Sequence, residues 1–163
     1  MLDDLLDEYA IRKVLELFMR RSDDCDAPGV AELFTPDGVF RVSGQEFVGR
    51  QAIVDFLLNE RQFIRNPPRW QDEGNLMDKP RGIHLISNPI FEIDGDLATS
   101  EVDCVTVHRT PDGEPRLGIL CRYRDRLTRT ADGKWLISDR TGVSVRRREP
   151  NEVEFLPSQV RGS

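Results

Sequence analysis

Histidine and cysteine are scarce in this sequence of 163 residues. There are 2 histidines and 3 cysteines, and Cys25, Cys104 and Cys121 are widely spaced, with no pair at the spacing of metal ligands. A zinc or iron centre needs several His, Cys or carboxylate ligands. We therefore expect no metal site made by this chain alone. Free thiols in a cytoplasmic protein are the simplest interpretation of the cysteines.

The sequence also lacks the motifs of several catalytic and membrane classes. No glycine-rich phosphate loop follows a strand pattern, and neither a Gly-x-Ser-x-Gly elbow nor a His-Glu-x-x-His motif occurs. No apolar run reaches the length of a membrane span, and the acidic start, residues 1–4, is unlike a signal peptide. Acid/base catalysis without a cofactor is the main enzymatic option that remains, and we expect a cytoplasmic location.

Positive charge is in the minority. Lys and Arg number 23 against 29 Asp and Glu, so the formal net charge is −6. This balance argues against a general nucleic-acid or anionic-membrane partner. The compact basic run Arg146-Arg147-Arg148 is followed at once by Glu149, and we interpret it as a solvated strand end. The length predicts a single domain with a sizeable core.

The first part of the chain predicts helices and one hairpin. Apolar residues recur at three- and four-residue spacing over 2–21, without Pro or Gly, which indicates a long helix. We expect Pro28-Gly29 to break the chain before a short helical piece at 30–34. The next expected elements are a turn at 35–38, a hairpin of 39–42 with 46–48, and a second full helix at 50–59.

Residues 60–81 show no periodicity and contain several Pro and Gly residues. A loop this long is uncommon inside a compact domain and is often a lid or a binding loop. Disorder is the alternative, although Phe63, Trp70, Leu76 and Met77 make the segment more apolar than disorder favours.

The second half predicts four long strands joined by three turns, which together form a meander. Pro89 in the first of them implies an edge strand or a bulge. Helices followed by an antiparallel sheet indicate an α+β fold rather than alternating βαβ units. The expected strands are 82–93, 97–108, 117–129 and 135–145.

The acidic stretch Ser22-Asp23-Asp24-Cys25-Asp26 ends the first helix and is a candidate site. A carboxylate at the inner end of a helix that covers a sheet can be desolvated by a pocket, which raises its pKa. We expect Asp23 to point into such a pocket and to meet His84 there. The alternative is that these acids solvate a helix terminus, and spacing alone favours that alternative.

The two histidines lie in neighbouring predicted strands. His84 shares a strand face with Ile86 if the pleat is regular. A histidine among apolar strand residues is more often a hydrogen-bonded core or interface residue than a catalyst. His108 ends the next strand, where it reaches either the same pocket or the solvent rim, and the rim is slightly favoured.

Two further strand residues are candidates to bind substrate oxygens. Tyr123 alternates with Arg122, so only one of the two faces inward. Arg140, in the last strand, is placed to bind a substrate oxygen or to fix Asp23, although a surface arginine is the commoner case.

Several short motifs, in their order and spacing, resemble the nuclear-transport-factor-2-like superfamily, in particular its SnoaL-like and scytalone-dehydratase-like branch. The resemblance covers about residues 5–146. Its motifs are Asp23-x-x-Asp26, Phe34-Thr35-Pro36-Asp37-Gly38-Val39-Phe40, Gly49-x-x-Ala52-Ile53-x-x-Phe56, His84-Leu85-Ile86-Ser87-Asn88-Pro89, Asp94-Gly95-Asp96-x-Ala98, Arg122-Tyr123-Arg124-Asp125-Arg126-Leu127 and Asp132-Gly133-Lys134-Trp135-x-Ile137-x-x-Arg140.

The resemblance implies a cone-shaped α+β barrel, in which a strongly curved antiparallel sheet is closed by N-terminal helices around an apolar pocket. One such domain would span 1–163, with a core at about 5–146, a loop insertion at 60–81 and a C-terminal tail at 147–163. The convex sheet face is usually covered by another subunit in this superfamily, so a homo-oligomer, a dimer or trimer, is expected.

The resemblance also implies an Asp-His dyad. His84 would be the general base and Asp23 its partner, and His108 lies where scytalone-type dehydratases place a second histidine. The implied protein is a lyase (dehydratase) or an isomerase or cyclase acting on a hydrophobic, aromatic or polycyclic small molecule. Its substrate-binding residues would be His108, Tyr123, Arg140, Phe18, Phe40, Phe56 and Trp70.

The sequence departs from the dehydratases at two places. Phe18 and Val42 stand near positions where those enzymes have tyrosines, which argues against hydration-linked chemistry on scytalone-like substrates. The alternative is a non-catalytic small subunit of an aromatic-ring-hydroxylating dioxygenase, or a small-ligand-binding module on the same fold. An apolar pocket beside Asp23 and His84 would distinguish an enzyme from a supporting subunit.

Overall fold

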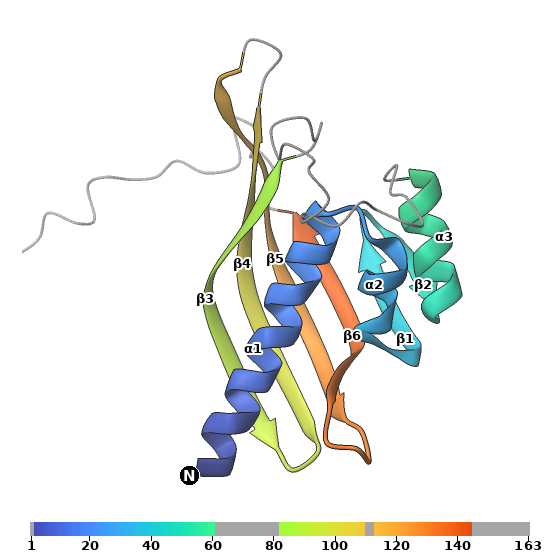
Figure 1. The fold of residues 1–163 in the computed structure, drawn as a ribbon, viewed down its shortest axis with the longest axis vertical. Coiled ribbons are helices and arrows are strands. Elements are labelled where there is room, and N and C mark those ends of the chain that lie inside the picture. The colour runs from blue at the N-terminus through green and yellow to red at the C-terminus, as the bar shows by residue number, and fades with distance from the viewer. Residues whose placement is uncertain (1, 61–81, 110–112, 145–163) are drawn as a thin grey trace, which may run out of the picture.

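The computed structural model describes residues 2–60, 82–109 and 113–144. Most of the expected lid loop, with Trp70, and the basic run at 146–148 therefore lie outside the described residues. In the described part, two helices come first, a hairpin and a third helix follow, and four long strands complete the sheet (Figure 1). None of the described helices is long and apolar enough to cross a membrane.

The predicted long helix is confirmed as α1, Leu2–Asp23, which extends to the acidic stretch. One side of it is buried, with Ile11 and Leu15 fully buried and Phe18 nearly so. Burying each of these large side chains stabilises the fold by about 1.5–3 kcal/mol. The helix lies along one face of the sheet, which we call the inner face (Figure 1). Its last residue, Asp23, lies next to His84, at the start of the first long strand of the meander.

The second helix begins earlier than predicted. α2 spans Ala27–Glu32, and Pro28 lies inside its first turn instead of breaking the chain before it. Asp26 caps this helix, because its carboxylate accepts a hydrogen bond of 2.9 Å from the backbone N–H of Gly29. Proline is tolerated there because the first N–H groups of a helix have no intrahelical partner. The predicted break is therefore a helix start. The third helix, α3, is Arg50–Glu60, close to the prediction.

Among the described residues, six strands form one open, curved sheet in the order β2-β1-β6-β5-β4-β3. The predicted meander is confirmed in its last four strands. The sheet is mixed rather than purely antiparallel, because β1 and β6 pair in parallel. The strands are β1 Phe34–Val42, β2 Gln45–Val48, β3 Ile83–Asp94, β4 Leu97–Arg109, β5 Pro115–Arg129 and β6 Trp135–Ser144.

Two irregularities in the strands involve prolines. Residues 35–38, predicted as a turn, lie within β1, where the register with β6 shifts between Phe34 and Val39. Pro89 lies in β3, an edge strand, at a register shift between Ser87 and Ile90. The prediction of an edge strand or bulge at Pro89 is thus confirmed in both parts.

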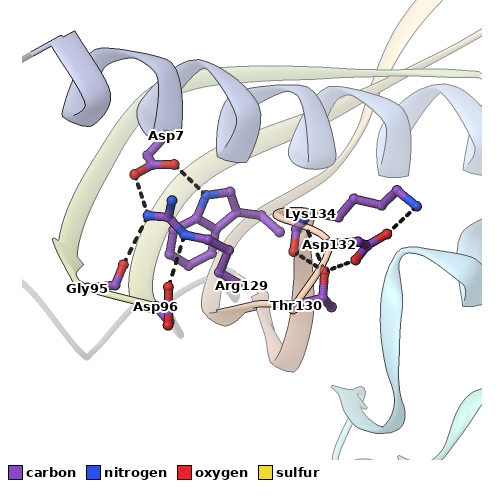
Figure 2. A network of polar contacts seen from close by, with 8 residues as sticks. Asp7, Gly95, Asp96, Arg129, Thr130, Asp132 and Lys134 are labelled. Atoms are coloured by element: carbon purple, nitrogen blue, oxygen red, sulfur yellow. Dashed lines mark hydrogen bonds and ion pairs between the residues drawn. The ribbon is translucent and has the colours of Figure 1, made fainter.

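A polar network fixes the start of α1 to the turn between β5 and β6 (Figure 2). Asp7 accepts a hydrogen bond of 3.0 Å from the indole Nε1 of Trp135, and it forms an ion pair with Arg129. The guanidinium of Arg129 also lies over the Trp135 ring, 4.9 Å from its centroid. Because this end of α1 is anchored, the position of its other end, with Asp23, is set along the sheet.

Candidate active site

Asp23 and His84 meet at the end of α1. Nδ1 of His84 lies 2.6 Å from Oδ1 of Asp23, and the backbone N–H of His84 donates to both carboxylate oxygens, at 3.1 and 3.2 Å. The Asp23 side chain is 12% exposed and the imidazole 27% exposed. The carboxylate therefore holds both the ring and the start of β3, while part of the ring stays open to solvent.

This contact decides which ring nitrogen of His84 is available. An ionised carboxylate only accepts hydrogen bonds, so the nitrogen facing it, Nδ1, carries the proton in the neutral ring. The lone pair then lies on Nε2, the nitrogen on the far side of the ring. A carboxylate in this position also stabilises the charged imidazolium after Nε2 takes up a proton, as in hydrolytic triads. Chemically, this arrangement allows the ring to act as a general base with the carboxylate as its orienting partner.

Arg140 is completely buried on the inner face, and it pairs with Asp125 rather than with Asp23. Its Nε and Nη2 atoms donate to the two carboxylate oxygens of Asp125 at 2.7 and 3.1 Å. The Ser100 hydroxyl donates to the same carboxylate at 2.9 Å. The Nη1 atom of Arg140 is buried and has no hydrogen-bond partner in the described part of the chain. A charged donor group is thus held in the core with one nitrogen available.

Aromatic rings surround this guanidinium. It lies 4.0 Å from the ring centroid of Phe18 and 4.5 Å from that of Tyr123, so both rings offer their π-faces to the charge. Tyr123 is the member of the Arg122/Tyr123 pair that faces inward, and Arg122 pairs with Asp103 outside. Phe40 lies 5.8 Å from Phe18, centroid to centroid, and Phe56 lies 6.0 Å from Phe40.

His108 stands at the exposed end of β4. Its Nε2 atom lies 2.9 Å from the hydroxyl of Thr106, which also accepts a hydrogen bond from the backbone N–H of Ile119. Thr106 is the register partner of His84 on the neighbouring strand. His108 therefore lies along the strand from His84, at the rim, and its ring is bonded to Thr106.

Two hollows of the sheet are formed elsewhere. One, of about 740 Å³, lies across the face opposite α1, which we call the outer face, and its lining includes Arg41, Glu101 and Arg124. The other, of about 460 Å³, lies near the turn between β3 and β4. Neither is lined by Asp23 or His84, so neither is the apolar pocket expected beside these two residues, and the buried phenylalanines near Arg140 contact one another.

Sequence reasoning missed two features of the inner face. Asp125, which binds Arg140, follows Tyr123 at the spacing of one strand face, and this alternation is the signal that could have found it. Cys104 and Cys121, read as unrelated thiols, are register partners on β4 and β5. Their pairing depends on the register of a long hairpin, which spacing along the chain does not give. In the part of the chain that the structure describes, no group of three or more potential metal ligands occurs.

Comparison with known proteins places the chain in a family. The model of the SnoaL-like domain matches residues 3–141. No curated protein matches the chain. One similar solved structure is that of a Mycobacterium tuberculosis protein of unknown function. Its sequence identity to this chain is 24% and its TM-score is 0.74, and the match covers 94% of this chain and 80% of that protein's chain.

Two further neighbours have the same fold. An NTF2-like protein with a cystatin-like fold from Novosphingobium aromaticivorans is 22% identical, with a TM-score of 0.72 over 90% of this chain and 87% of its own. ActVI-ORFA from Streptomyces coelicolor is 23% identical, with a TM-score of 0.69 over 87% of this chain and 97% of its own. With the curved sheet and the helix across it, these findings show that the chain belongs to the SnoaL-like family of NTF2-like folds.

Proposed function

We propose that the protein is a cofactor-independent acid/base enzyme, a lyase (dehydratase) or an isomerase or cyclase, acting on a hydrophobic, aromatic or polycyclic small molecule. The observation that carries this proposal is the hydrogen bond of 2.6 Å between Asp23 and Nδ1 of His84. It leaves Nε2 as the basic nitrogen on a ring that is 27% exposed. A base with an orienting carboxylate and an open side is what proton abstraction requires.

In this mechanism Nε2 of His84 removes a proton from a carbon next to a carbonyl or similar activating group. The electron pair of the broken C–H bond moves toward the activating oxygen, and the imidazole becomes cationic beside the Asp23 carboxylate. In elimination, the electron pair then expels a leaving hydroxyl, to which His84 returns the proton, so that water departs. In isomerisation, His84 returns the proton to a different carbon.

The negative charge that develops on the substrate oxygen needs a donor. Arg140 Nη1 is a charged donor that has no hydrogen-bond partner among the described residues. It is already desolvated, so binding an oxygen there would cost little further desolvation. We assign Arg140 and Tyr123 to this oxygen and His108 to a second polar group at the rim. Phe18, Phe40 and Phe56, and Trp70 in the segment outside the described residues, would contact the apolar rings of the substrate.

Relatives of the same fold support a small-molecule ligand. One solved structure, from Catenulispora acidiphila, is a complex with S-DNPA; it is 24% identical, with a TM-score of 0.69. At this identity the likeness concerns the fold, so the substrate class assigned to this chain rests on its own residues.

A second candidate function, which the sequence also left open, is that of a non-catalytic subunit of a ring-hydroxylating oxygenase. A putative aromatic ring hydroxylase from Novosphingobium aromaticivorans shares the fold, with 20% identity and a TM-score of 0.64. The outer face also exposes large apolar side chains that a partner subunit would cover: Ile83, Leu85, Leu117, Leu120 and Val143. We propose that a second copy of this chain covers them, and co-purification with a metal-containing oxygenase subunit would support the other candidate.

The enzyme is tested with a panel of aromatic ketones and alcohols in deuterated water. NMR follows both the exchange of the activated C–H and the formation of products. We expect His84→Ala to abolish exchange and Asp23→Asn to reduce it by about 100-fold or more, within the range of general-base contributions. Asp24→Asn, the same change one residue along, is the matched control and should retain exchange. Unchanged turnover in both site variants would refute the mechanism.

A further inference from the structure

Cys104 and Cys121 stand directly opposite each other on the inner face. They are register partners in the antiparallel pairing of β4 with β5, and both side chains are buried, with 1% and 8% exposed. Opposite residues in such a pair have Cα atoms about 4.5–5.5 Å apart. A disulfide accepts Cα separations of about 4.4–6.8 Å. Backbone register alone therefore places these two thiols where a covalent bond can join them.

Polar and charged groups of the candidate site surround the pair. Cys104 is also the register partner of Ile86, two residues along β3 from His84. The interaction between the two thiols is the largest cause of the pKa shift at each of them. The groups from other elements and neighbouring strand positions that act on them electrostatically or by hydrogen bonding are Asp23 of α1, His84 of β3, Tyr123 of β5 and Arg140 of β6.

These surroundings shift the pKa values of the two thiols in opposite directions. The hydrogen bond from Cys104 is the largest cause that lowers the pKa of Cys121, to about 7, against the opposing effect of burial. Tyr123, His84 and Arg140 lower the pKa of Cys121 further. The same hydrogen bond, together with burial, raises the pKa of the Cys104 thiol. Cys121 is therefore the thiol that ionises more readily, and it is also the more exposed of the two, at 8% against 1%.

We propose that Cys104 and Cys121 are a redox-active pair, which hydrogen peroxide or another small hydroperoxide oxidises to a disulfide between β4 and β5. The Cys121 thiolate attacks a peroxide oxygen, the O–O bond breaks, and a sulfenic acid and hydroxide form. The Cys104 sulfur then attacks the Cys121 sulfur, and the sulfenic hydroxyl leaves with the Cys104 proton as water. In total, two thiols and one hydrogen peroxide molecule give one disulfide and two waters, and with an organic hydroperoxide an alcohol forms in place of one of the waters.

This site is separate from the proposed acid/base chemistry and does not depend on it. A thiol reductant reverses the reaction by attacking the disulfide, which returns both cysteines to thiols. Only a small oxidant fits the proposal, because 8% of Cys121 is exposed. The disulfide would link β4 and β5, the two central strands of the meander. Cys104 lies two residues along β4 from Thr106, the register partner of His84.

The experiment uses the full chain with Cys25→Ser, which removes the third thiol, half-buried at the end of α1. After treatment with one equivalent of hydrogen peroxide and unfolding, free thiols are counted and peptides are mapped without reductant. We expect both thiols to be lost together, a Cys104–Cys121 linked peptide, a mass lower by two hydrogen atoms, and full recovery with dithiothreitol. Retained thiols, or separate sulfinic acids without a linked peptide, would overturn the proposal.

Two variants assign the roles of the sulfurs. With Cys104→Ser added, Cys121 should accumulate as a trappable sulfenic acid. With Cys121→Ser added, thiol oxidation at pH 7 should slow by roughly tenfold, because an ordinary thiol is only a few per cent thiolate there. Equal rates in the two variants would overturn the assignment. The peptide map of the native chain needs no substitution, because Cys25 serves there as the internal control. The proposal can therefore still be tested if one of the variants fails to fold.

Discussion

Asp125 holds the buried guanidinium of Arg140 through two hydrogen bonds, of 2.7 and 3.1 Å, and neither side chain is exposed. A buried charge without its partner is costly, because the core offers it no water. We therefore predict that Asp125→Ala lowers the free energy of unfolding by about 3–5 kcal/mol, as measured by urea denaturation. Asp103→Ala breaks the exposed ion pair with Arg122 and is the matched control, which should unfold close to the native midpoint.

The network at the other end of α1 makes a second prediction. Asp7 accepts from both Trp135 and Arg129 (Figure 2) and its side chain is 15% exposed. Asp7→Ala leaves the indole N–H and the guanidinium without this acceptor, so we expect a loss of about 1–3 kcal/mol. Hydrogen exchange should quicken in the first turns of α1. Glu8→Ala removes only the exposed pair with Arg12, and equal effects of the two changes would contradict the anchoring role.

The thiols give a pH-dependent prediction. Because the pKa of Cys121 is lowered to about 7 in the folded chain, alkylation by iodoacetamide should rise with a midpoint near pH 7. In the unfolded chain the midpoint should move toward 9.0, the ordinary value. Between pH 7 and pH 9 the unfolded state binds more protons at this thiol than the folded state does. The folded chain therefore gains stability from Cys121 as the pH rises from 7 to 9, and this contribution is lost as the pH falls through 7. Alkylation of the folded chain with a midpoint near 9.0 would contradict the assignment.

The outer face predicts self-association. Leu85 and Leu120, exposed by 49% and 51%, lie on the strand face opposite α1. Contact with a second copy would bury them, so Leu120→Lys should shift the mass measured by light scattering toward the monomer. Leu97→Lys, at the far turn and 61% exposed, changes the charge equally and should leave the mass unchanged. A native chain that is monomeric at all concentrations would contradict this prediction.

Local patterns in the sequence predict much of this fold. The apolar spacing in 2–21 and the turns of the meander identify elements whose bounds differ from α1, β3, β4, β5 and β6 by a few residues. The errors occur where strand pairing with distant residues, or a capping side chain, determines the local structure. Residues 35–38 have turn chemistry, yet they lie in β1, which pairs with β6 about 100 residues away along the chain. Pro28 starts a helix because Asp26 caps it.

The candidate site is predicted only in part, for a similar reason. Asp23 and His84 are found through the order of motifs, because 61 residues separate them and no spacing rule links them. The sequence singles out Arg140, but its pairing with Asp125 depends on which face of β5 turns inward. The contact between Cys104 and Cys121 depends on the register between β4 and β5, which shifts between Val105 and Val107. Irregularities of this kind are set by packing rather than by local sequence.

The tautomer of His84 tests the central claim most directly. Nitrogen-15 NMR of the imidazole, with and without a panel of aromatic ketones, distinguishes a protonated Nδ1 from a protonated Nε2. We predict a neutral ring with the proton on Nδ1 and the lone pair on Nε2, a change in this preference in Asp23→Asn but not in Asp24→Asn, and shifts at Nε2 when a ketone binds. A proton on Nε2, or a ring that responds neither to Asp23→Asn nor to any ketone, would contradict the account and favour the supporting-subunit function.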